Sequence, residues 1–213
     1  MRYKHVIWDW NGTLINDRWL CVQGLNHSLE KRGLPKITEE VYREKFMFPV
    51  KDFYKRVGFD FSKEPFEFVG DEFVSFYKNF FNNTELHLMA SHVVREIKNT
   101  GISQYILSAG RQDHLIEWVK SHNLFDYFEI IRGIDNHYAE GKIETGVQLK
   151  KNITSSNKEV IMIGDTIHDS EVADAMDIDC YLINHGHVNR KRLKKTGRKV
   201  FSSLSEILDY IIN

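Results

Sequence analysis

The sequence lacks several features that mark large classes of proteins. Its 213 residues include only two cysteines, Cys21 and Cys180, which lie far apart and form no CxxC or Cys/His pattern. We therefore expect a reducing compartment and no structural zinc site. No apolar run approaches the roughly 18 residues needed to cross a bilayer, and the amino-terminal stretch carries charge too early for a secretory signal. These absences predict a soluble, cytoplasmic protein.

Excess charge of either sign is also absent. The formal net charge is −1 at pH 7, so no global electric field attracts nucleic acid or an anionic membrane. Residues 189–199 are rich in lysine and arginine but have no interleaved aromatic residues, and we interpret them as a solvated helix and loop. Neither nucleic acid nor a membrane is an expected partner, and we expect a monomer or a weak dimer.

Phenylalanine is abundant and unevenly distributed. Of the 14 phenylalanines, 11 lie between Phe46 and Phe81, which indicates a separately packed unit. Helical patterns cover four segments in this part of the chain, residues 16–33, 38–46, 50–57 and 65–81. Asn16 or Asp17 is the predicted cap of the first segment and Ser62 that of the last. Residues 15–85 are therefore predicted to form an all-helical domain.

Five short runs rich in isoleucine and valine predict strands. They are HVIWD, SQYILSA, YFEIIRG, KEVIMIGD and CYLIN, and helical segments separate most of them. Strands that alternate with helices are typical of a parallel sheet covered on both faces. We predict a doubly wound, Rossmann-like α/β core made of residues 1–14 and 86–213, with the helical domain inserted after the first strand.

Three of the predicted strands end in a polar or acidic residue, namely Asp9, Ser108 and Asp165. In an open parallel sheet, ligands bind beyond the carboxyl ends of the strands, so these side chains are expected to face one another. Asp169 follows Asp165 by one helical turn. Clustered carboxylates repel one another, and a hard cation such as Mg²⁺ with its oxygen ligands relieves that repulsion. The sequence therefore predicts a magnesium site.

The Asn11-Gly12 pair has a second interpretation, because Asn-Gly between apolar flanks is a strong signal for a tight β-hairpin. A hairpin strand exposed on one face should alternate apolar and polar residues. Val6-Ile7-Trp8 is instead continuously apolar, as in a strand buried on both faces. This run favours a buried strand followed by a loop over a hairpin.

The polar motifs resemble those of the haloacid dehalogenase superfamily. DWNGTL, residues 9–14, resembles the first motif, Asp-x-Asp-Gly-Thr, and GDTIHD, residues 164–169, resembles the fourth, Gly-Asp-x-x-x-Asp. Ser108 is similar to the serine of the second motif, and Lys142 suits the lysine of the third, with Lys150 and Lys151 as nearby competitors. The 99 positions that separate Asp9 from Ser108 suit an inserted helical cap domain, as in the phosphoglycolate phosphatase-like branch.

The resemblance implies a Mg²⁺-dependent phosphatase that acts on a small phosphorylated metabolite. Asp9 would attack the phosphorus atom and form an aspartyl-phosphate, which water then cleaves. Mg²⁺ would be held by the Asp9 carboxylate, the Asn11 main-chain carbonyl and Asp165, with Asp169 binding directly or through water.

The same resemblance implies how the phosphate would be held. Ser108 and nearby backbone N–H groups, that of Ala109 included, would bind phosphate oxygens. Lys142 would neutralise charge on the nucleophile and the phosphate.

The chain departs from the family pattern at Asn11, where the family has a second aspartate. That aspartate protonates the leaving oxygen and then activates water, whereas an asparagine side chain has no titratable proton. General acid–base catalysis is worth about 10²–10⁴-fold, so the loss matters. His168 and Asp17 are possible substitute acids.

Two functions therefore stay open. The first is a phosphatase for a phosphoglycolate-like phosphomonoester, either slow or served by a substitute acid. The second is a weakly active or inactive protein that binds or senses a phosphorylated ligand.

Overall fold

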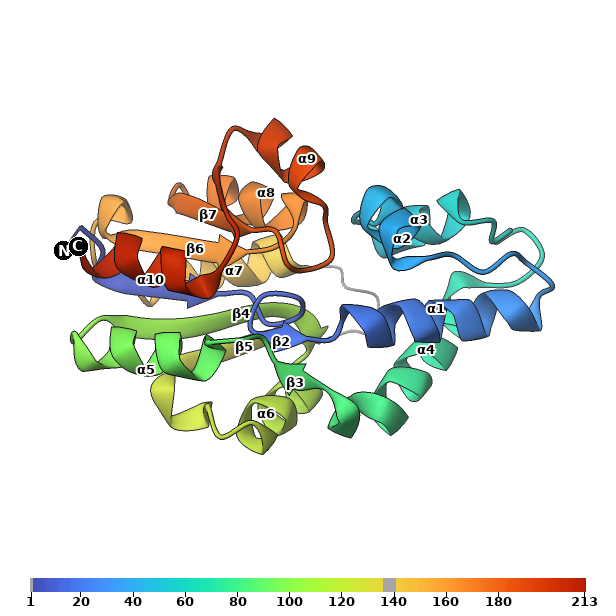
Figure 1. Ribbon diagram of the computed structural model, residues 1–213, viewed down its shortest axis with the longest axis horizontal. Coiled ribbons are helices and arrows are strands. Elements are labelled where there is room, and N and C mark those ends of the chain that lie inside the picture. The colour runs from blue at the N-terminus through green and yellow to red at the C-terminus, as the bar shows by residue number, and fades with distance from the viewer. Residues whose placement is uncertain (1, 136–140) are drawn as a thin grey trace.

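The computed structural model describes residues 2–135 and 141–213, which form an α/β region and a helical region (Figure 1). The α/β region holds a six-stranded parallel sheet with the strand order β5-β4-β1-β6-β7-β8. Its strands are β1 (His5–Trp8), β4 (Ser103–Arg111), β5 (Ile130–Ile134), β6 (Val160–Gly164), β7 (Asp179–Ile183) and β8 (Lys199–Phe201). The chain leaves β1 toward β4 and β5 and returns to its other side at β6, so the strand order reverses beside β1.

Helices cover both faces of this sheet. The buried residues of α5 (Ala90–Asn99), α6 (Gln112–Ser121) and α10 (Leu204–Ile212) pack with Val6 and Trp8 of β1. Those of α7 (Lys142–Lys151) and α8 (Ile167–Ala175) pack with Ile7, which points to the opposite face. The doubly wound α/β fold is confirmed, and β1 is apolar throughout because both of its faces are buried.

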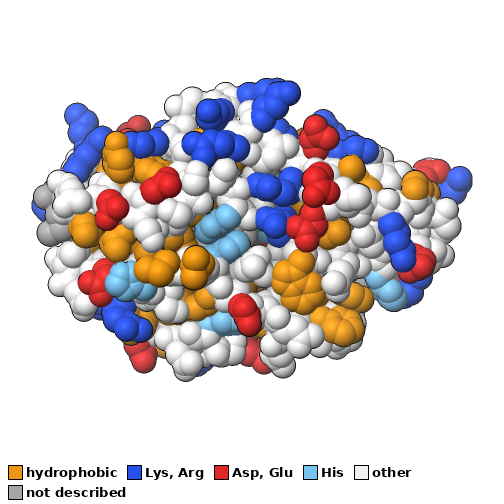
Figure 2. All heavy atoms as spheres, viewed as in Figure 1, with side chains coloured by type: hydrophobic (Ala, Val, Ile, Leu, Met, Phe, Trp, Pro, Cys, Tyr) orange, Lys and Arg blue, Asp and Glu red, His pale blue; other side chains and the backbone are white. Residues whose placement is uncertain are grey.

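Short helices connect several of these elements. They are α9 (Arg190–Leu193) and the 3₁₀ turns η1 (Phe81–Asn83), η2 (Phe125–Tyr127), η3 (Asn157–Glu159) and η4 (Lys194–Thr196). Basic side chains gather over α9 at the top of the face in Figure 2, and elsewhere on that face acidic and basic side chains are interspersed. The Arg192 guanidinium donates to the main-chain oxygens of Arg43 and Phe46, 3.0 and 2.7 Å away, which links α9 to the helical region.

The helical region lies between β2 (Ile15–Asn16) and β3 (Glu85–Leu86), which pair antiparallel where the chain enters and leaves it. It consists of α1 (Arg18–Lys31), α2 (Glu39–Lys45), α3 (Val50–Arg56) and α4 (Phe66–Phe80), close to the four predicted segments. The predicted Ser62 cap is wrong: Pro65 occupies the N-cap position of α4, and the Ser62 hydroxyl donates to Asp60 instead. Asp17 is the N-cap residue of α1, but its side chain makes no cap hydrogen bond there.

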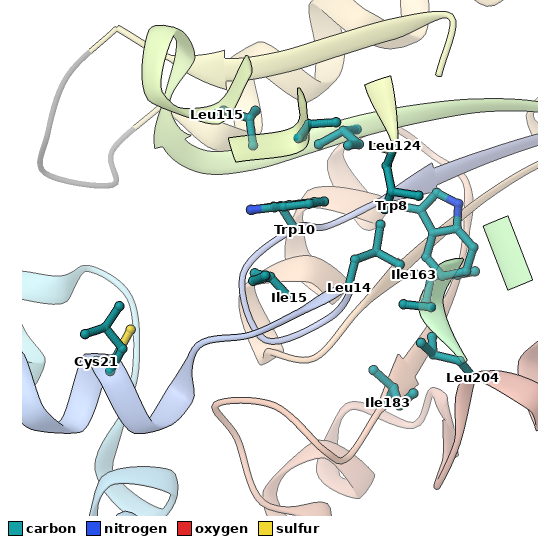
Figure 3. Close-up of a cluster of buried hydrophobic side chains, with 14 of the residues drawn as sticks. Trp8, Trp10, Leu14, Ile15, Cys21, Leu115, Leu124, Ile163, Ile183 and Leu204 are labelled. Carbon is teal, nitrogen blue, oxygen red and sulfur yellow. The ribbon is translucent and has the colours of Figure 1, made fainter. Parts of the chain in front are cut away.

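The two regions share one continuous set of buried side chains. Phe53 and Phe66 of the helical region belong to the same apolar cluster as Ile163 of β6. Figure 3 shows part of it, from Cys21 on α1 through Trp10 in the loop after β1 to the sheet. The division into a core and a cap at residues 15 and 85 therefore stays a prediction. No helix in the described ranges is long and apolar enough to span a bilayer.

Candidate active site

The loop after β1 brings a carboxylate to the carboxyl edge of the sheet. The Asp9 N–H donates to the Ile163 carbonyl at 2.8 Å, and the chain then turns tightly at Gly12, where φ is 75°. A Cβ atom on Gly12 would lie 2.6 Å from Asp165 Oδ2 and 2.4 Å from His187 Cδ2, so both the conformation and the space require glycine. The hairpin interpretation is wrong, because β1 pairs in parallel with two distant strands.

Three buried carboxylates meet at this edge. Asp9, Asp165 and Asp169 each offer an oxygen, and these atoms lie within 4.8 Å of one another. The buried Lys142 ammonium donates to Asp9 Oδ1 at 2.5 Å and to Asp169 Oδ1 at 2.6 Å. The Thr13 hydroxyl lies 2.9 Å from Asp165 Oδ1 and 3.2 Å from Asp9 Oδ2. The structure thus brings together side chains from three distant parts of the chain, near residues 9, 142 and 165.

The charges in this carboxylate cluster are only partly balanced. Burial raises the pKa of Asp9 well above its usual range and outweighs Lys142, while repulsion from Asp169 and Asp165 adds to the rise. Burial likewise raises the pKa of Asp165 to about 6. Asp169 behaves differently: Lys142 and Thr166 outweigh its burial and hold its pKa below the usual value. The Lys142 ammonium thus contacts two of the three carboxyl groups, and burial makes Asp9 and Asp165 hard to ionise.

This donor set fits a hard divalent cation. Mg²⁺ binds through carboxylate and carbonyl oxygens, and one such ion would offset the charge that Lys142 leaves unbalanced. The backbone closely surrounds the acids: a Cβ atom on Gly186 would lie 2.0 Å from Asp165 Oδ2, and one on Gly164 would lie 2.3 Å from Asp169 Cγ. The backbone at Gly186 and Gly164 therefore packs directly against the Asp165 and Asp169 side chains.

The predicted phosphate-binding serine lies beside this cluster. The fully buried Ser108 hydroxyl donates to Asn11 Oδ1 at 3.2 Å and accepts from the Gly110 N–H at 3.0 Å. Ala109 and Gly110 line the same cavity as Asp9. Their roles toward a phosphate stay predictions.

A cavity of about 190 Å³ extends from the carboxylate cluster into the helical region. Asp9, Asn11, Lys142 and Asp169 form its polar end. The rest of its wall is mainly apolar, and we call six of its rings the aromatic chamber: Phe46, Phe53, Phe66, Phe73, Tyr77 and Trp118. The Asp9 carboxylate and a large apolar space therefore share one cavity.

Residues 6–183 of the chain match the family model of the haloacid dehalogenase-like hydrolases. The chain belongs to this family. This confirms the resemblance found in its motifs, and the match covers both Asp9 and Asp165. No curated protein sequence matches the chain.

Solved structures of the same fold include proteins described as predicted phosphatases. A haloacid dehalogenase-like family hydrolase from Streptococcus pneumoniae has a TM-score of 0.86 at 18% identity over 98% of each chain. A predicted phosphoglycolate phosphatase from Haemophilus somnus has a TM-score of 0.81 at 15% identity, over 99% of this chain and 98% of its own. A predicted phosphatase from Clostridium acetobutylicum has a TM-score of 0.81 at 17% identity, over 100% and 99%. At these identities the likeness establishes the fold.

Within this haloacid dehalogenase-like hydrolase, Asn11 belongs to a second buried network. Its Nδ2 donates to Asp17 Oδ2 at 2.8 Å and to the Tyr77 hydroxyl at 3.0 Å. The Asp17 carboxylate also accepts from the Gly12 N–H at 2.9 Å and from Tyr77 at 2.8 Å, and His187 Nε2 lies 3.3 Å away. No local pattern in the sequence indicates this Asn11–Asp17 network, because Tyr77 and His187 are distant from Asn11 along the chain.

The network bears on the two possible substitute acids. Burial opposes ionisation of Asp17, but the charge of His187 and hydrogen bonds from several partners outweigh it and keep the Asp17 pKa below its usual value. An ionised carboxylate with filled acceptor positions has no proton to give. His168 lines a different pocket, stacked on Phe48 with Nδ1 2.9 Å from Glu171. The geometry therefore favours neither residue as a replacement for the missing acid.

Proposed function

We propose that this hydrolase is a Mg²⁺-dependent phosphatase that cleaves a small organic phosphomonoester through an aspartyl-phosphate on Asp9. The observation that carries the proposal is the cluster of three buried carboxylates around Lys142 at the polar end of the cavity. Asp9, Asp165 and Asp169, together with the Asn11 carbonyl, would hold Mg²⁺. The bound ion would supply charge neutralisation for the phosphoryl group.

Asp9 is the proposed nucleophile because it lies at the cavity and carries an activating partner. Its carboxylate would form a bond to phosphorus while the ester P–O bond breaks, and water would then release phosphate and regenerate the acid. Lys142, 2.5 Å from Asp9, favours the charged form of the nucleophile and would offset charge on the transferring group. Ser108 and the N–H group of Ala109 would position the phosphate oxygens.

The helical region has a role in this proposal. Residues 15–85 would act as a cap domain over a core of residues 1–14 and 86–213, since the cavity wall beyond Asp9 comes largely from α1 to α4. The cap would exclude water and contact the organic part of the substrate. Phosphoglycolate, the substrate type that the resemblance implies, is the reference compound for testing this.

A second candidate function is favoured by Asn11. A protein that lacks the proton donor but keeps the metal site could bind a phosphorylated ligand without turning it over. The protein would then be a sensor of the ligand, and this function requires only that the ligand bind in the cavity.

Beryllium fluoride trapping combined with a turnover assay separates the two functions. The protein is incubated with Mg²⁺ and phosphoglycolate, phenyl phosphate or acetyl phosphate, and released phosphate is measured. The phosphatase proposal expects Mg²⁺-dependent release and a beryllium fluoride adduct that blocks it. An adduct without release of phosphate from any of the compounds would favour the sensor. Neither adduct nor release would reject both functions.

A further inference from the structure

The cavity wall beyond Asp9 bears on the chemical class of the substrate. Building on the proposed phosphatase function, we infer that the organic group of the substrate is apolar and aromatic rather than anionic. Two separate features carry this inference: the wall of the aromatic chamber and the asparagine at position 11.

The aromatic chamber presents rings from three sides. Phe46 and Phe53 come from the α2–α3 part of the helical region, with ring centroids 5.2 Å apart. Phe66, Phe73 and Tyr77 come from α4, and the Tyr77 ring lies 5.2 Å from that of Trp118 on α6. Such walls bind ligands by burying apolar surface and by offset or edge-to-face ring contacts. Because these rings and Asp9 line the same cavity, a phenyl group held here would belong to the same molecule as the phosphate bound at Asp9.

An anionic organic group has no evident partner in the described part of this wall. A carboxylate in an apolar cavity is costly unless a cation or several donors meet it. Four basic side chains line the cavity, of which Lys142 pairs with Asp9 and Asp169, and Arg111 pairs with Asp113 at 2.6 Å. The His114 ring lies against that of Trp118, with centroids 5.5 Å apart. His187 is paired with Asp17. The carboxylate of phosphoglycolate would compete with these carboxylates for their cations.

Asn11 points to the same class by a different route. Without a general acid, the first step depends on how well the leaving oxygen carries negative charge. A phenol such as the tyrosine side chain ionises near pH 10, whereas water, which alkanols resemble, has a pKa of about 15.7. An aryl phosphate therefore needs the missing proton far less than an alkyl phosphate does.

The proposed step is balanced without any further reactant. An Asp9 carboxylate oxygen forms a bond to phosphorus, the aryl O–P bond breaks, and its electron pair leaves with the aryl oxide, which takes a proton from solvent. Water then attacks the phosphorus atom of the aspartyl-phosphate, inorganic phosphate departs, and the Asp9 carboxylate is restored.

A matched substrate pair isolates the effect of the chamber. Benzyl phosphate and phosphoglycolate share a CH₂–O–phosphate group and differ by a phenyl ring in place of a carboxylate, so both have alkoxide leaving groups. We expect kcat/KM for benzyl phosphate to exceed that for phosphoglycolate by about 10- to 100-fold, the range that burial of one ring supports. Phenyl phosphate, which adds the better leaving group, should be faster still than benzyl phosphate. A higher kcat/KM for phosphoglycolate would overturn the inference and leave the phosphatase proposal intact.

A binding arm keeps the inference testable if no turnover is found. Benzylphosphonate and phosphonoacetate are the corresponding pair that cannot be hydrolysed, and their affinities with Mg²⁺ present are measured by calorimetry. Tighter binding of benzylphosphonate supports the chamber's selectivity even if the protein proves to be a sensor. Tighter or equal binding of phosphonoacetate rejects it.

Variants of another residue that lines the cavity test whether this wall sets the substrate preference. Val74, half-buried on α4, lines the cavity. Val74→Arg introduces a cation and should shift the benzyl-to-glycolate preference toward phosphoglycolate by about 10-fold or more, whereas Val74→Leu should keep the original ranking. Thermal melts confirm that both variants are folded. An unchanged preference in folded Val74→Arg would contradict recognition by this wall.

Discussion

The protein buries the carboxylate cluster and the Asn11–Asp17 network next to each other, and the two differ in how well their charges are balanced. In the carboxylate cluster, Asp9 and Asp169 share the ammonium of Lys142, and Asp165 lies beside them without an ion pair to that lysine. In the Asn11–Asp17 network, one carboxylate faces His187, whose pKa is raised to about 9 because Asp17 and neighbouring acids outweigh its burial. The first group is short of positive charge, and the second is balanced.

The difference separates a reactive site from a structural one. A buried carboxylate that is paired and hydrogen-bonded is stable in its charged form, and removing it exposes its partner. A cluster with more carboxylates than cations is strained until a ligand or metal ion arrives. Removing a charge from the carboxylate cluster is therefore expected to lower turnover without lowering the free energy of unfolding. Removing the charge of Asp17 from the Asn11–Asp17 network is expected to lower the free energy of unfolding. The following experiments test that contrast.

The largest effect is expected from Asp9→Asn, which removes the nucleophile. Turnover of any phosphomonoester should fall by about 10⁴-fold or more. Because Lys142 keeps Asp169 as a partner and repulsion among the clustered carboxylates falls, the free energy of unfolding of the metal-free protein should stay the same or rise. Steady-state assays, phosphoenzyme labelling and denaturant titrations measure these effects.

His168→Ala is the matched control for this variant. His168 lines a different pocket, so its loss should change turnover by no more than a few-fold. Retained turnover in Asp9→Asn, or its loss in His168→Ala, would place the chemistry elsewhere.

Removal of the metal should have the next largest effect. EDTA is expected to lower turnover by about 10³-fold, since a bound cation is worth several kcal/mol to a phosphoryl transfer. Readdition of Mg²⁺ or Mn²⁺ should restore it and should raise the melting temperature, because the ion binds only the folded cluster. Full activity in chelator would refute the proposed magnesium site.

Asp17→Asn should destabilise the fold where Asp9→Asn does not. The change leaves the buried charge of His187 without its carboxylate, and breaking a buried ion pair in this way costs about 3–5 kcal/mol. Urea unfolding of the two variants at the same pH gives the comparison directly. If Asp17→Asn unfolds no more easily than Asp9→Asn, the proposed difference between the two groups is wrong.

Much of the fold and of the carboxylate cluster could be predicted from the sequence. The apolar runs marked β1, β4, β5, β6 and β7, because strands buried on both faces are apolar throughout. The strand β8 is not among the predicted strands, because it has only three residues and one of them is an exposed lysine. The sequence places Asp9, Ser108 and Asp165 at one edge of the sheet, because parallel strands bring their carboxyl ends together.

The Asn11–Asp17 network could not be found in this way. Its partners come from α4 and from the loop after β7, so no spacing in the sequence relates them. The sequence therefore showed that a proton donor was missing at Asn11, but not that a second carboxylate lies 2.8 Å from its amide. Because of that contact, Asn11→Asp is expected to raise alkyl-phosphate hydrolysis less than the absence of an acid alone would suggest.

The smallest effect, and the most informative about Asn11, is expected from Asn11→Asp. The introduced carboxyl group would meet Asp17 in place of an amide donor, so two acids would compete for one set of donors. Alkyl-phosphate hydrolysis should rise by only about 10²-fold, the lower end of the range for general acid–base catalysis. Acyl and aryl phosphates should gain less, because their leaving groups need little protonation. Phosphate release with matched alkyl and aryl substrates measures the difference.

Asn11→Asp combined with Asp17→Asn decides whether the neighbouring acid limits that gain. The double variant exchanges the two side chains and returns the site to one carboxyl group, so its stability should exceed that of either single variant and its alkyl-phosphate activity should exceed that of Asn11→Asp. Asn-Gly sequences are prone to deamidation, so the intact mass of each fresh preparation must exclude aspartate or isoaspartate at position 11 before rates are compared. If undeamidated wild-type protein already hydrolyses alkyl phosphates as fast as both variants, the asparagine is no handicap. The proton would then have to come from solvent or the substrate, because Asp17 is ionised and His168 lies outside the cavity.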